Sequence, residues 1–96
     1  MIYANLWKLT DEGVKTMNNV PQWSERVKQV CREYKGDLKN MYLCMGEYDV
    51  ICLIDAPTDA AMFNILTAVT SWGVAHTETL RCMPVEEYAQ AIKMAA

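Results

Sequence analysis

The chain has 96 residues, of which 52% are hydrophobic and 22% are charged, a composition typical of one small globular domain and not of a disordered segment. The net charge is −3 at pH 7, and no basic block is present, which argues against nucleic acid as a partner. The apolar runs are too short to cross a membrane and the start lacks a signal peptide, so we expect one cytoplasmic domain over residues 1–96.

The first part of the sequence alternates between strand and helix patterns. Residues 2–9 are apolar on both faces of a period-two pattern, which predicts a strand that is covered on both sides. Residues 10–13 break this strand and lead into a short helical turn, followed by a loop that ends at Pro21. Residues 22–35 carry an apolar stripe at helical spacing, and Gly36 is the stop signal.

The second part of the sequence predicts a hairpin, a helix, a last strand and a tail helix. The expected elements are strands over residues 38–45 and 48–55, a helix capped by residues 56–59 and ended by Gly73, a strand over residues 74–82 and a short terminal helix. Gly46 and Glu47 between the two hairpin strands are a weak two-residue turn signal, so a bulge or a longer turn is the alternative.

The predicted order is β-α-β-β-α-β with a tail helix, the ferredoxin-like α+β arrangement of an antiparallel sheet with helices on one face. Two strands, over residues 2–9 and 48–55, are apolar on both faces, yet the helices cover only one face. We therefore expect a second copy to cover the other face in a homodimer or higher homo-oligomer of paired sheets. Space enclosed by such an assembly would suit a small apolar or amphipathic ligand.

The segment Gly46-Glu47-Tyr48-Asp49 is accompanied by other motifs along nearly the whole chain. They are Thr10-Asp11-x-Gly13, Pro21, Asp55-Ala56-Pro57, the segment 73–81 and Glu86-Glu87-Tyr88. In these residues the chain resembles the GYD-domain family. The resemblance implies a ferredoxin-like fold of the dimeric α+β barrel type, and it implies a fold and a site region more than an activity.

Tyr48 and Asp49 are the first candidate site residues. A carboxylate beside a phenol at the mouth of a strand is suited to proton handling, with Asp49 as the base and Tyr48 as the group that orients or donates. The alternative is that Asp49 accepts backbone N–H bonds in the turn. Asp55 lies at the far end of the same predicted strand, too distant to act with Asp49 on one substrate atom.

His76 is the only histidine, and strand alternation places it on the same face as Glu78. One interpretation is a general base with its orienting carboxylate; the other is an exposed rim residue without chemistry. Trp7 and Tyr42, together with Glu78, are predicted to line an apolar ligand pocket, although core packing explains the same aromatic residues. Haem bound through His76 is a minor alternative.

The four cysteines are Cys31, Cys44, Cys52 and Cys82, and no two of them form a C-x-x-C pair. With a single histidine, this pattern argues against a zinc site, so we expect no metal and no cofactor. Buried, reduced thiols are the favoured interpretation. Thiol redox or metal chemistry through the last three cysteines is the alternative, and it requires an exposed thiol of low pKa.

Besides the thiol chemistry just described, two functional hypotheses remain open at this point. The first is a homo-oligomeric protein that binds a small molecule and carries out cofactor-free proton transfer through Asp49, His76 and Tyr48. The second is an assembly or regulatory module without chemistry, in which the Gly-Glu-Tyr-Asp motif only shapes a turn. Whether the protein is an enzyme is therefore undecided.

Overall fold

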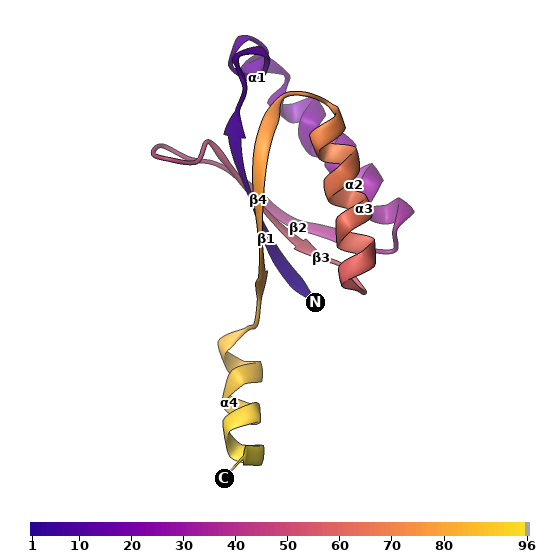
Figure 1. Ribbon diagram of the computed structural model, residues 1–96, viewed down its shortest axis with the longest axis vertical. Helices are drawn as coiled ribbons and strands as arrows, with labels where there is room; N and C mark the ends of the chain where they lie inside the picture. Colours follow the sequence, from indigo (N-terminus) through magenta and orange to yellow (C-terminus); the bar gives the residue numbers. More distant parts are fainter. Residues whose placement is uncertain (96) are drawn as a thin grey trace.

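The computed structural model describes residues 1–95 and contains one four-stranded antiparallel sheet with two long helices on one face (Figure 1). In chain order the elements are β1 (Ile2–Leu9), α1 (Asp11–Lys15), the 3-10 turn η1 (Met17–Asn19), α2 (Val20–Glu33), β2 (Asp37–Leu43), β3 (Val50–Asp55), α3 (Asp59–Ser71), β4 (Ala75–Cys82) and α4 (Val85–Ala95). The strand order β2-β3-β1-β4 confirms the predicted ferredoxin-like α+β fold.

The core lies between the sheet and the pair α2 and α3. Alternate residues of β1 and β3 point at the helices, and the register pairs Trp7 with Val50 and Tyr3 with Ile54. The helices contribute the buried residues Trp23, Val27, Cys31, Met62, Ile65 and Val69. Each large apolar side chain that is fully buried in this way contributes about 1.5–3 kcal/mol to folding.

The other face of the sheet has no helix over it within residues 1–95, since α2 and α3 lie on the same side (Figure 1). Strand register places the following residues on this side: Ile2, Ala4, Leu6, Lys8, Tyr42, Ile51, Leu53, His76, Glu78, Leu80 and Cys82. We call this surface the open face. Its centre is apolar, and Leu80 is 46% exposed. The predicted two-sided character of β1 and β3 is therefore present, but residues 1–95 of a single chain leave one of the two sides without a helix over it.

The tail helix α4 extends away from the rest of the molecule (Figure 1). No residue of α4 is buried, and Tyr88 and Ile92 of its apolar stripe are 57% and 52% exposed. The amphipathic pattern of this helix would place Tyr88 and Ile92 on an inward face if the helix packed on its own domain. The stripe exists, but the described part of the same chain does not cover it.

Several element boundaries differ from the prediction. α2 begins at Val20, with Pro21 inside its first turn, whereas a loop was expected there. Proline is tolerated at this position because the first N–H groups of a helix have no intrahelical partner. β2 ends at Leu43 and β3 begins at Val50, so residues 44–49 form the longer turn that was the alternative to a two-residue turn.

The thiols of Cys31 and Cys52 are buried in the core. Burial raises the pKa of Cys31 to about 11 and that of Cys52 to about 12, so both remain protonated at neutral pH. Only the thiolate reacts readily with disulfide reagents. We expect Cys31 and Cys52 to stay unlabelled by an aromatic disulfide reagent in the native protein and to react quickly in urea, as followed by peptide mass spectrometry. Fast native labelling of Cys52 would instead support thiol chemistry.

Candidate functional site

Asp49 ends the connection between β2 and β3 and is bonded to the backbone of β1. Its N–H donates to the carbonyl of Trp7 at 2.8 Å, and its carboxylate Oδ2 accepts from the N–H of Leu9 at 2.9 Å. Trp7 is the last residue of β1 that pairs with β3. The carboxylate therefore satisfies a backbone donor of β1 where the β3 ladder has already ended.

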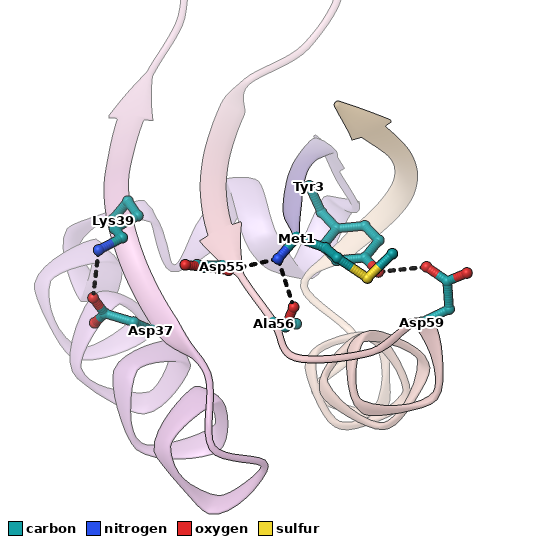
Figure 2. Close-up of polar contacts among 7 residues, drawn as sticks. All are labelled: Met1, Tyr3, Asp37, Lys39, Asp55, Ala56 and Asp59. Carbon is teal, nitrogen blue, oxygen red and sulfur yellow. Dashed lines mark hydrogen bonds and ion pairs between the residues drawn. The ribbon is translucent and has the colours of Figure 1, made fainter. Parts of the chain in front are cut away.

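Asp55 has a similar place at the opposite end of β3. Its Oδ1 lies 2.9 Å from the amino nitrogen of Met1, which also donates to the carbonyl of Ala56 at 3.0 Å (Figure 2). Asp55 thus holds the start of β1 against the end of β3, and it is remote from Asp49.

Tyr48 reaches across β1 on the open face, and its hydroxyl donates to the carboxylate of Glu78 on β4. This hydrogen bond raises the pKa of Tyr48, and the negative charges of Glu78 and Glu47 act in the same direction. The phenol is therefore protonated at neutral pH. It can donate a hydrogen bond, but it cannot act as a base there.

His76 lies beside Tyr48 and Glu78 at the same end of the open face. It is exposed and sits opposite Lys8 in the β1–β4 ladder. A shallow hollow of about 160 Å³ is lined by Lys8, Tyr48, His76, Thr77 and Glu78. We call Lys8, Tyr48, His76 and Glu78 the rim cluster. It combines donors and acceptors in contact with water, which suits hydrogen bonding to a partner better than desolvated acid–base chemistry.

Trp7 and Tyr42 are not brought together with the rim cluster in one pocket. Trp7 is fully buried on the helix side of the sheet, where its indole N–H donates to Asn5 and its ring lies 6.2 Å from that of Trp23. Tyr42 is 51% exposed on the open face of β2. The sheet therefore separates these two aromatic residues.

Within residues 1–95, no group of three His, Cys, Asp or Glu side chains is arranged to hold a metal ion. No helix in that range combines the length and the apolar character needed to span a membrane.

A second site, which the sequence analysis did not single out, lies between α3 and the strands β1 and β4. We call it the α3 pocket. It has a volume of about 370 Å³ and is lined by Tyr3, Asp59, Met62, Phe63, Leu66, Thr79 and Arg81. The available signal was strand alternation, which puts Arg81 on the face of β4 opposite to His76 and hence beneath the helices.

Comparison with known proteins identifies relatives of this chain. The family model of the GYD domain matches residues 3–92. A Thermus thermophilus protein named glutamine synthetase and cystathionine beta-lyase binding protein is 29% identical over 89 residues, which are 88% of this chain and 90% of that protein. The crystal structure of TTHA0845, also from Thermus thermophilus, is similar, with a TM-score of 0.54 and 24% identity over 88% of this chain and 99% of that one.

The solved structure supports the fold alone at this level of identity. The family model, in contrast, spans nearly the whole sequence and includes the Gly-Glu-Tyr-Asp segment at residues 46–49. It also includes β2, β3 and β4 in full, all of β1 except Ile2, and most of α4. The chain therefore belongs to the GYD domain family.

Proposed function

We propose that this protein is a non-catalytic binding protein that pairs with a second copy through the open face and docks onto a larger enzyme. The observation that carries the proposal is the open face itself, a sheet surface with an apolar centre that no helix within residues 1–95 covers. The relative named for binding glutamine synthetase and cystathionine beta-lyase supports the second part, because it matches this chain over most of both lengths.

A second copy is the occupant that fits the open face best. Ala4, Leu6 and Leu53 form an apolar centre on adjacent strands, and two such sheets pack face to face about 10 Å apart. In a pair related by a twofold axis, the same apolar surface of each copy covers that of the other, so no different protein is needed to cover it. A domain of this size buries only about 65% of its unfolded surface when it is alone, so pairing adds stability that it needs.

The position of α4 supports the same assembly. The radius of gyration is 14.6 Å, compared with about 12.5 Å expected for a compact domain of this length. The excess comes from α4, which carries exposed Val85, Tyr88 and Ile92 away from its own core. An amphipathic helix that projects in this way gains stability by laying its apolar stripe on another molecule. In the proposed pair it lies on the partner copy.

The connection between β2 and β3 provides a surface for the larger enzyme. Residues 44–49 project from the sheet on the side away from α2 and α3 (Figure 1). Met45 is fully exposed at this projection, and Lys8 with Glu47 adds a loose ion pair of 3.8 Å near its base. An adaptable apolar side chain surrounded by polar groups is typical of protein-binding surfaces.

Under this proposal the Gly-Glu-Tyr-Asp motif shapes the projecting connection. Gly46 has a φ of 141°, which side-chain-bearing residues rarely adopt, and Asp49 bonds the connection to β1. Tyr48 holds it against β4 through Glu78. The α3 pocket favours a second candidate function, the binding of a small molecule on the other side of the sheet.

Replacing Leu53 by Lys should abolish the proposed pairing. The substitution buries an unpaired charge at the centre of the interface, so we expect the dissociation constant of the pair to rise at least about 100-fold. Light scattering after gel filtration should give twice the 10.9 kDa chain mass for the wild type and the single mass for the variant. Gln29→Lys, which adds the same charge on the exposed side of α2, is the matched control. A monomeric wild type would refute the pairing.

Enzyme binding is tested with purified glutamine synthetase and cystathionine beta-lyase from the organism that supplies this chain. We expect the wild type to bind at least one of them in biolayer interferometry, and Met45→Lys to weaken that binding because the apolar contact is lost. Gln29→Lys again serves as the control. If neither enzyme binds at concentrations up to about 10 μM, the docking proposal is wrong.

Substitutions of Asp49 separate architecture from chemistry. Asp49→Ala leaves the Leu9 N–H without its acceptor, so we expect the free energy of unfolding to fall by about 1–3 kcal/mol. Asp49→Asn keeps an acceptor oxygen in the same place, so its loss should be smaller. Urea denaturation measures both. Equal stability of Asp49→Asn and Asp49→Ala would contradict this structural role. If both variants also lost function to the same extent, Asp49 would be a general base.

A further inference from the structure

The α3 pocket has one apolar wall and one polar floor. The wall comes from α3, where Met62, Phe63 and Leu66 lie on adjacent turns and face the same side. The floor comes from β1 and β4, on which Tyr3 and Arg81 are directly paired. A volume of about 370 Å³ is within the range of small-molecule sites.

The polar groups at the floor are linked by hydrogen bonds in a series that ends at Arg81. The Tyr3 hydroxyl donates to Oδ1 of Asp59 (Figure 2), and Nη1 of Arg81 lies 3.4 Å from Oδ2 of the same carboxylate. Burial raises the pKa of Tyr3, and the bond to Asp59 adds to the effect, so the phenol stays a donor to Asp59. Both oxygens of Asp59 are thus engaged, and its charge is balanced by Arg81.

The polar groups of the floor that can still bind a ligand are hydrogen-bond donors. A guanidinium has five N–H donors, and Asp59 accepts from one side of Arg81 at a long distance. The Thr79 hydroxyl accepts from the amide of Asn5 at 2.9 Å, which leaves its own proton to donate into the pocket. A ligand therefore needs acceptor oxygens at this end. A cationic ligand is disfavoured, because Arg81 already neutralises Asp59, the carboxylate among the described lining residues.

We propose that the α3 pocket binds a small carboxylic acid with an apolar body, its carboxylate on Arg81 and Thr79 and its body against Met62, Phe63 and Leu66. A carboxylate accepts two parallel N–H bonds from a guanidinium, which improves on the loose pair with Asp59. Phe63 is 68% exposed at the pocket, so a bound apolar body would bury it. The site is on the helix side of the sheet and is therefore separate from the proposed pairing surface.

The test is an NMR titration of the isotope-labelled protein with 3-phenylpropanoate and 4-methylpentanoate. The neutral amide 3-phenylpropanamide, which has the shape of the first acid without its charge, is the matched probe. We expect saturable shifts of the amides of Met62, Leu66 and Thr79 with the acids. The amide should bind at least about tenfold more weakly, which is the usual value of a charged hydrogen bond.

Two variants assign the two ends of the ligand. Arg81→Gln should weaken both acids at least about tenfold and leave the amide unchanged, whereas Phe63→Ala should weaken acids and amide alike. Both side chains are more than half exposed, so the variants should fold, as their spectra will show. Arg32→Gln on the exposed side of α2 should change nothing.

Three results would overturn the proposal. One is the absence of saturable shifts with both acids up to about 10 mM, beyond the weak end of useful small-ligand affinity. Another is equal affinity of the acids for the wild type and Arg81→Gln. The third is a set of shifts confined to the open face, which would place the ligand between paired sheets. Failure of pairing in Leu53→Lys would leave the pocket intact, so the two proposals fail separately.

Discussion

β1 lies between β3 and β4 and carries apolar side chains on both of its faces, so both surfaces of the sheet need a cover. On one side Tyr3 and Trp7 are buried in the core that also contains residues of α2 and α3. On the other side Ala4 and Leu6 are at the centre of the open face, where each Å² of apolar surface left in water costs about 25 cal/mol. The proposed pairing, the projecting α4 and the two-sided pattern of β3 all follow from this one strand.

Local patterns in the sequence were sufficient to predict the order of the elements. The stripe of Trp23, Val27 and Cys31 in α2 is buried as its helical spacing indicates, because such a stripe depends only on the period of the helix itself. The start of β3 was not predictable in the same way. It depends on Asp49, whose carboxylate bonds to Leu9, 40 residues earlier, and no local pattern records a contact of that span.

The candidate site shows the same division between local and distant information. Alternation along β4 placed His76 and Glu78 on one face, and the structure adds Tyr48 from the far side of β1. Trp7 lies on the opposite face of the sheet, because Trp7 and Lys8 are consecutive residues of β1 and their side chains point to opposite sides. Asp59 and Arg81 come from different elements, and only the placement of α3 over the sheet brings them within 3.4 Å of each other.

The strand order also has a consequence for how the chain acquires its fold. β1 is made first, yet its two neighbours in the sheet are β3 and β4, and the β1–β4 ladder joins Ile2 to Cys82. The apolar strand therefore has no partner until β3, which begins at Val50, has left the ribosome, and its other edge stays unpaired until β4 follows. Long sequence separation between paired strands slows folding and lengthens the time for which aggregation-prone apolar surface is exposed. The strand at the centre of the finished sheet is therefore, during synthesis, the one whose partners are both made after it.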